Sequence, residues 1–178
     1  MNLQDNDFAL MGLPERFALD RAVLDERWKQ LQREVHPDRF ASQGAAAQRV
    51  AMQWSMRVNE AYSRLKDPLQ RAAYLCELRG ARIDAERNTA MPAAFLMQQM
   101  EWREALDEAT DEAALDALLA ETRAARQTLL AQLEQQLDAP NAATEQAAQA
   151  ADSVRALMFV ERFSQEVLTR MDRLLDPS

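Results

Sequence analysis

The chain has 178 residues, enough for one large domain or two small ones, and 48% of them are hydrophobic. Only three are glycine, and alanine, leucine, glutamine, glutamate and arginine dominate, which favours helices over sheets. The net charge of -8 belongs to the second half, because residues 1–80 carry +1 and residues 81–178 carry -9, so neither half has the basic footprint of a nucleic-acid-binding protein.

The first residues, 1–7, have no basic start and no apolar run, so we expect neither a secretory signal nor a mitochondrial presequence there. No later stretch is long and apolar enough to predict a membrane span. Cys76 is the only cysteine, which excludes an internal disulfide and a CxxC zinc site and fits a reducing compartment. We therefore expect a cytoplasmic protein without membrane contact.

Two helices are predicted for the first part of the chain. The first begins after Asp20, a good N-cap, and runs to about His36, where Pro37 ends it. The second runs from about Ala45 to Lys66. Facing apolar stripes and a short turn predict an antiparallel hairpin. The stripes are Leu24, Trp28, Leu31 and Val35 on the first helix, and Val50, Trp54, Val58, Ala61 and Leu65 on the second.

A shorter helix should begin at Asp67-Pro68 and end at Gly80, with Cys76 packed in it. Residues 80–92 show no sustained period and predict a connection between two domains. Three more helices are expected over roughly 92–109, from 111 onward, and over roughly 145–175. Short loops between them imply antiparallel neighbours and therefore a three-helix bundle.

The first of these three helices has two distinct faces. Phe95, Trp102, Leu106 and Ala109 share one stripe, which should face the core. Leu96, Met97 and Met100 lie off that stripe, beside Glu101, Glu104 and Glu108, and Phe159 of the last helix is a candidate addition. These off-stripe apolar residues either pack against the connection or the first domain, or form an exposed docking patch with an acidic rim.

The tripeptide His36-Pro37-Asp38 allows three interpretations. It can be an ordinary capped turn, because His suits a helix C-terminus and Pro and Asp suit turns. It can mark a catalytic site, but His36 is the only histidine, and no Gly-rich loop, serine elbow or carboxylate cluster accompanies it. We therefore expect no catalytic residue. The third interpretation, a recognition motif for a partner protein, depends on the residues around it.

Those residues resemble a J-domain. Residues 29–40 are similar to its second helix and loop, residues 58–74 to its third helix and the start of its fourth, and residues 8–14 to its opening segment. The resemblance implies a module that binds DnaK-class chaperones and accelerates their ATP hydrolysis. It implies that Asp38 pairs with an arginine of the chaperone, that His36 and Pro37 shape the loop, and that Lys29, Arg33 and Arg39 supply positive charge.

The charge of that face departs from the general J-domain pattern. Asp25 and Gln30 stand where J-domains usually carry basic residues. Because charge complementarity governs partner choice more than raw affinity, a dedicated chaperone is expected as the partner rather than a general DnaK.

The second half resembles the C-terminal domain of the HscB family, J-domain co-chaperones of iron–sulfur cluster assembly. Residues 89–108 and 154–163 carry this resemblance. It implies that the specialised chaperone HscA binds the J-domain and that the scaffold protein IscU binds the second domain. The scaffold-binding set carried over by position is Leu96, Met97, Met100, Glu101, Glu104, Glu108 and Phe159.

The expected molecule is all-α and L-shaped, with a J-domain hairpin over residues 1–80, a connection over 81–91 and a three-helix bundle over 92–178. The resemblance fits a bacterial co-chaperone, and we expect it to be cytoplasmic and monomeric and to need no cofactor and no metal. Any iron–sulfur cluster sits on the scaffold. The alternative is a J-domain co-chaperone that serves a different DnaK-class chaperone and a different client.

Overall fold

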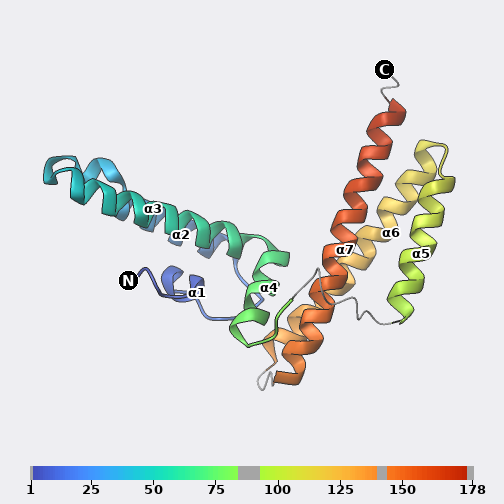
Figure 1. Ribbon diagram of the computed structural model, residues 1–178, viewed down its shortest axis with the longest axis horizontal. Helices are drawn as coiled ribbons and strands as arrows, with labels where there is room; N and C mark the ends of the chain where they lie inside the picture. The colour runs from blue at the N-terminus through green and yellow to red at the C-terminus, as the bar shows by residue number, and fades with distance from the viewer. Residues whose placement is uncertain (1, 84–92, 140–143, 176–178) are drawn as a thin grey trace. The chain divides into compact units, whose positions relative to one another are not determined.

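The computed structural model describes residues 2–83, 93–139 and 144–175, and every regular element in these ranges is a helix (Figure 1). This confirms the all-α class, and the predicted boundaries of the longer helices agree with the observed ones to within a turn. The elements in chain order are α1 (Asp7–Met11), α2 (Arg21–Val35), the 3-10 helix η1 (Pro37–Gln43), α3 (Ala45–Lys66), α4 (Pro68–Leu78), α5 (Ala93–Glu108), α6 (Glu112–Asp138) and α7 (Thr144–Leu175).

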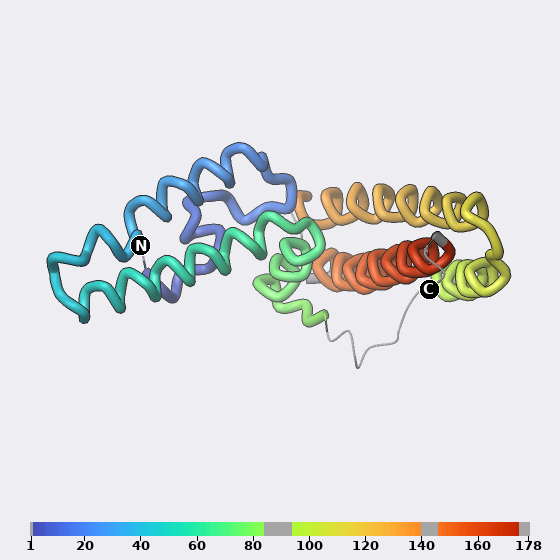
Figure 2. Tube along the Cα trace, turned by 90° about the horizontal axis from the view of Figure 1, so that it is seen from above, coloured from blue at the N-terminus to red at the C-terminus, as the bar shows by residue number. Residues whose placement is uncertain are grey.

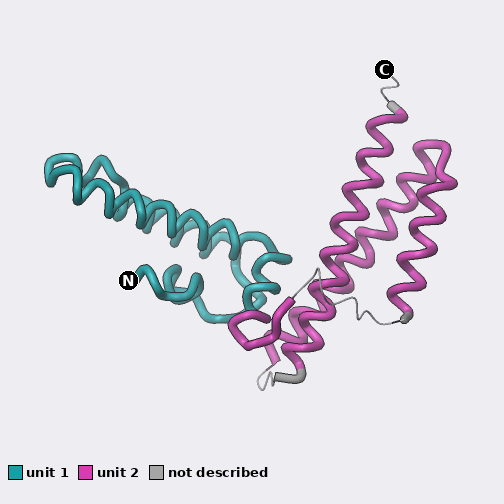
Figure 3. Tube along the Cα trace, viewed as in Figure 1, with its two compact units in different colours: residues 1–75 teal, residues 76–178 magenta. Residues whose placement is uncertain are grey.

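The chain folds as two compact units, residues 1–75 and 76–178, drawn in teal and magenta in Figure 3. The division falls within α4, before the boundary expected at residue 80. Its cause is packing at the start of the second unit, where Cys76 and Ile83 are buried. The buried Arg155 of α7 donates from Nη1 to the Ile83 carbonyl over 3.0 Å. Of the connection expected at 81–91, residues 84–91 lie outside the described residues.

Unit 1, residues 1–75, is built on the antiparallel hairpin of α2 and α3, which lie side by side in Figure 2. α2 begins where the Asp20 carboxylate accepts from the backbone N–H groups of Ala22 and Val23, and it ends before Pro37. The two predicted stripes meet between the helices, as a hairpin requires. Their buried members are Leu24, Leu31, Val35, Val58, Ala61 and Leu65, while Trp28 and Trp54 are half-buried.

The stripe predicted for α3 is wrong at Val50, whose side chain is 52% exposed, whereas Ala51 is buried. Neighbours on a helix point about 100° apart, so Val50 and Ala51 cannot both face α2. Ala51 precedes Val58 by two turns and therefore shares its buried face. Val50 is left at the open edge of the hairpin, near its tip.

The short helix α1, which the sequence pattern does not predict, is held to α3 and α4 by the buried Asp7. Its carboxylate lies 2.7 Å from Arg57 Nη2 and 2.7 Å from Arg64 Nη1. Arg64 donates a hydrogen bond to this carboxylate. The Arg57 guanidinium is close enough to the carboxylate to form an ion pair, but its orientation does not make a hydrogen bond. The backbone N–H of Asp7 donates to the Tyr74 hydroxyl over 3.1 Å. At the end of α1, Gly12 takes the left-handed conformation, φ 65°, that the turn requires.

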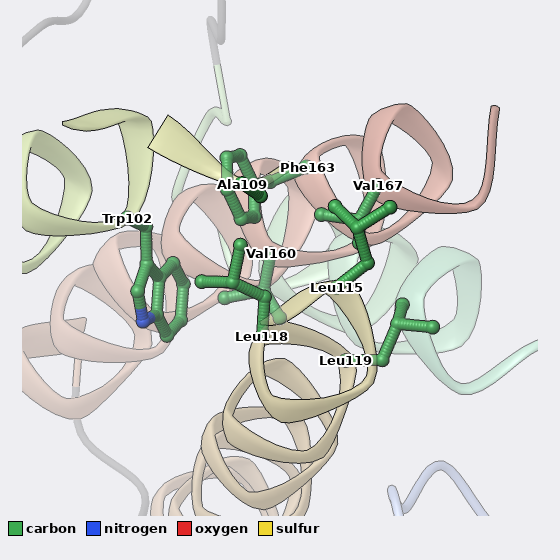
Figure 4. Close-up of a cluster of buried hydrophobic side chains, with 8 residues drawn as sticks. All are labelled: Trp102, Ala109, Leu115, Leu118, Leu119, Val160, Phe163 and Val167. Atoms are coloured by element: carbon green, nitrogen blue, oxygen red, sulfur yellow. The ribbon is translucent and has the colours of Figure 1, made fainter. Parts of the chain in front are cut away.

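Unit 2, residues 76–178, is the expected three-helix bundle of α5, α6 and α7. Asp111 caps α6 by accepting from the N–H of Ala114 over 2.9 Å, which explains why that helix begins there. Neither α7 nor any other described helix is long and apolar enough to span a membrane. Residues from all three helices and from the turn after α5 form the core cluster in Figure 4: Trp102, Ala109, Leu115, Leu118, Leu119, Val160, Phe163 and Val167.

Candidate interaction surfaces

The turn at the tip of the α2–α3 hairpin presents the Asp38 carboxylate to solvent. The side chain of Asp38 is 90% exposed. His36 Nδ1 accepts a hydrogen bond from the Asp38 backbone N–H over 3.3 Å, and the His36 carbonyl accepts from the Arg39 N–H over 3.0 Å. The same Nδ1 lies 3.6 Å from Asp38 Oδ2. His36 and Pro37 thus shape the turn, and the turn leaves the Asp38 side chain exposed to solvent.

Basic side chains gather on the last turns of α2, beside this tip. Lys29 and Arg33 are exposed and lie four residues apart on one helix face. Arg39 Nη1 donates to the Arg33 carbonyl over 3.0 Å, which caps the end of α2 and places the Arg39 guanidinium against it. Lys29 Nζ lies 3.0 Å from the exposed Glu26 carboxylate. The basic residues and the turn therefore form one surface.

The two positions that depart from the general J-domain pattern are occupied by internal contacts. The hydrogen bond from Arg21 to Asp25, 2.6 Å long, lowers the pKa of that carboxyl, and the Tyr62 hydroxyl donates to it over 3.0 Å. Gln30 accepts from Arg27 over 2.9 Å and donates to Glu34 over 3.1 Å. Neither side chain adds positive charge to the surface formed by Lys29, Arg33 and Arg39.

A second surface lies on the outer face of α5 in unit 2. The side chains of Leu96, Met97 and Met100 are 43%, 63% and 72% exposed. On the opposite side of the same helix, Trp102 is buried in the core and Phe95 packs against it, as the sequence pattern predicts. The acidic residues beside the apolar group, Glu101, Glu104 and Glu108, are also exposed. Within unit 2 these side chains therefore lie outside the core, and the docking patch stays a prediction. We call Leu96, Met97 and Met100 the α5 patch.

Phe159, the candidate addition from α7, differs from the rest of that set because it is half-buried in the aromatic edge of the core. Its ring centroid lies 5.8 Å from that of Phe95 in a T-shaped pair and 5.9 Å from that of Phe163 in a stacked pair. The ring of Trp102 stacks on it at 6.4 Å. Phe159 therefore supports the packing of α5 on α7 as well as bordering the surface.

Arg103 of α5 is a residue of this surface that sequence reasoning did not find. It pairs with Glu166 of α7, and its guanidinium lies 5.8 Å from the centroid of the Phe159 ring. Arg103 and Glu166 are too far apart in the chain for a helical period to relate them, so the local sequence pattern does not predict the pair.

Within the described ranges, no group of three or more His, Cys, Asp or Glu side chains could hold a metal ion.

Comparisons with known proteins identify relatives of the whole chain. A family model described as the HSCB C-terminal oligomerisation domain matches residues 91–168. The co-chaperone protein HscB homolog of Burkholderia mallei (strain SAVP1) is 52% identical over 177 residues, 98% of each chain. Its counterpart from Burkholderia multivorans is 51% identical over the same length.

Two solved structures are also similar to this chain. The chaperone HscB from Vibrio cholerae has a TM-score of 0.77 and 37% identity and covers 96% of this chain and 99% of its own. The human co-chaperone protein HscB has a TM-score of 0.86 and 26% identity, over 96% of this chain and 84% of its own.

Proposed function

Because the chain belongs to the HscB family of co-chaperones, we propose that it binds the scaffold IscU, delivers it to HscA and stimulates the ATPase of that chaperone. The observation that carries this proposal is the solvent-exposed Asp38 carboxylate at the tip of a two-helix hairpin. A carboxylate displayed in a rigid turn is suited to a charge-assisted pair with an arginine of a partner. In this scheme the chain itself carries out no chemistry.

The chaperone-binding surface consists of the turn and the basic end of α2. Asp38 pairs with the chaperone, and His36 and Pro37 hold the turn in shape. Lys29, Arg33 and Arg39 meet an acidic surface of the chaperone and accelerate encounter. The internal contacts of Asp25 and Gln30 support a dedicated chaperone such as HscA over a general DnaK, because they reduce the length of the basic surface.

The scaffold-binding surface is the α5 patch with its acidic rim. Three exposed apolar side chains in one group are the kind of surface that binding to another protein buries, and methionine adapts its shape to a partner. Glu101, Glu104 and Glu108 favour a scaffold face that carries basic residues, and Phe159 is the member of the scaffold-binding set that comes from α7. The alternative, a different chaperone and client, uses the same two surfaces with different partners.

The ATPase activity of purified HscA, measured with and without IscU, tests whether the chain stimulates the chaperone. We expect the full chain to stimulate HscA, with a further increase when IscU is present, and to stimulate DnaK weakly. Asp38→Asn removes the charge that pairs with the chaperone and should abolish stimulation. Asp172→Asn removes an exposed carboxylate of α7; it is the control and should have no effect. Stimulation of DnaK alone would show that the chaperone assignment is wrong.

Isothermal calorimetry with IscU tests the scaffold surface. Leu96→Ala combined with Met97→Ala should weaken binding by at least about 2 kcal/mol, as hot-spot truncations do, and leave basal HscA stimulation intact. Leu168→Ala, which truncates a 38% exposed leucine on α7, is the matched control. Phe159→Ala is measured separately and with an unfolding curve, because its ring also packs in the core. Unchanged affinity for the double variant would remove the α5 patch from the interface.

A further inference from the structure

An apolar pocket of about 450 Å³ lies at the tip of the α2–α3 hairpin, and the functions assigned above do not use it. Three segments line it: the last turn of α2, the 3-10 helix η1 and the first turns of α3. Its apolar lining comes from Val35, Phe40, Ala47, Val50, Ala51 and Trp54. The volume falls within the range of about 300–1,000 Å³ that is typical of ligand pockets.

Four of the six apolar lining residues are left partly or largely uncovered by the hairpin core, whereas Val35 and Ala51 are buried in it. Val50 is 52% exposed, and Phe40, Ala47 and Trp54 are half-buried. Glu34 is the only ionisable residue of the lining, and Gln43 is its other polar member. With no cation in the lining and one carboxylate, the pocket suits an uncharged, apolar side chain.

The place of the pocket in the chain indicates what fills it. Val35 directly precedes His36, and Phe40 follows Asp38 by two residues within η1. A protein that pairs with Asp38 over a standard interface of about 800 Å² per partner must also cover the neighbouring segments of the tip. Apolar anchors seated in pockets near charged contacts carry much of the binding energy of such interfaces.

We propose that this pocket receives an apolar side chain of the DnaK-class chaperone, so that the tip holds the chaperone by an anchor while Asp38 triggers it. The inference rests on the proposed function and adds a second element to the same surface. The two elements have different tasks. The pocket sets affinity, and the Asp38 carboxylate sets the maximal rate of ATP hydrolysis.

The test is the HscA ATPase as a function of the concentration of the full chain. Val50→Gln places a polar group in the pocket lining, and Ala47→Leu fills the pocket from within; both residues lie on α3 and both replacements are good helix formers. We expect each to raise the half-saturating concentration by at least about tenfold and to leave maximal stimulation unchanged. Met56→Gln, at a 67% exposed site of α3 outside the pocket, is the matched control and should equal the wild type.

The outcomes separate this inference from the function on which it rests. If the wild-type chain stimulates neither HscA nor DnaK, the proposed function is wrong, and so is the proposal that the pocket binds the chaperone. If the wild type stimulates but both pocket variants keep its half-saturating concentration, only the anchor is overturned. A loss of maximal stimulation at unchanged half-saturation also overturns it. The proposal is also overturned if the pocket joins two copies of this chain. In that case sedimentation would show self-association of the wild type that Val50→Gln abolishes.

Discussion

His36 and Asp38 are two residues apart and have different tasks in the turn after α2. The His36 ring and carbonyl accept backbone hydrogen bonds within the turn, so its role is to hold the backbone. The Asp38 carboxylate makes no comparable structural bond and is 90% exposed. This division explains why Asp38→Asn should remove function without loss of fold, whereas a change at His36 alters the turn itself.

Cys76 illustrates how burial controls the chemistry of a single side chain. Burial raises the pKa of its thiol from 9.0 to about 11. We predict that the folded protein does not react with a thiol reagent such as DTNB at pH 8, while the protein in denaturant reacts at one thiol per chain. Rapid labelling of the native protein would contradict the burial of this residue.

The same shift predicts a loss of stability in alkali. The pKa is higher in the folded state, so the stabilisation is complete below the unfolded pKa near 9 and is lost as the pH rises toward about 11. Urea titrations at pH 8, 9 and 10 should therefore show a steeper alkaline decline for the wild type than for Cys76→Ala. The comparison isolates the contribution of the thiol, because every other ionisable group is the same in the two proteins. Parallel declines would show that the thiol does not contribute.

At the scale of elements, unit 1 depends on one buried carboxylate that joins α1 to α3. Asp7 is fully buried, whereas the side chains of Arg57 and Arg64 are 18% and 33% exposed. Burial disfavours the charged Arg64 guanidinium, but the nearby Asp7, Glu60 and Tyr74 side chains together outweigh this and raise the pKa of Arg64. The pairing keeps α1, and with it Phe8 and Met11, against the hairpin.

Asp7→Asn should lower the free energy of unfolding by about 3 kcal/mol, because it leaves two arginines without their buried counter-charge. The value is at the lower end of the range for a broken buried pair, since both arginines keep contact with water. Glu60→Gln removes the exposed partner of Arg64 and should change stability by less than about 1 kcal/mol. Urea denaturation followed by circular dichroism measures both. Equal effects of the two variants would contradict the structural role of Asp7.

At the scale of the whole molecule, the proposed activity requires both units on one chain. Unit 1 carries the tip that is proposed to act on the chaperone, and unit 2 carries the α5 patch. Covalent linkage makes the second binding event intramolecular, so its effective concentration exceeds that of a separate molecule at micromolar concentration. Stimulation is therefore directed to a chaperone that meets the bound scaffold.

A mixing experiment tests this requirement. The Asp38→Asn variant retains the scaffold-binding surface, and the Leu96→Ala, Met97→Ala variant retains Asp38 and the chaperone-binding surface. At micromolar concentrations an equal mixture should recover less than about a tenth of the IscU-dependent increase in HscA ATPase, because the two surfaces no longer share a chain. Recovery to the wild-type level would show that the two surfaces act independently.

Much of the fold and part of the candidate sites follow from local patterns in the sequence. Asp20, Pro37 and Asp111 mark helix ends because caps and proline act within one turn. The helical period also separates the α5 patch from the core-facing Trp102, and the exposures agree with that separation. These features are readable because each depends on residues within a few positions of one another.

Tertiary structure alone decided the features that join distant segments. Asp7 meets Arg57 and Arg64, and Phe159 packs on Phe95, across separations at which helical periodicity relates no residues. The choice of Ala51 over Val50 for the hairpin core depends on where α2 lies, and so does the pocket that Val50 lines. A helical pattern assigns each side chain to a face of its own helix, but the packing of other helices decides what that face meets.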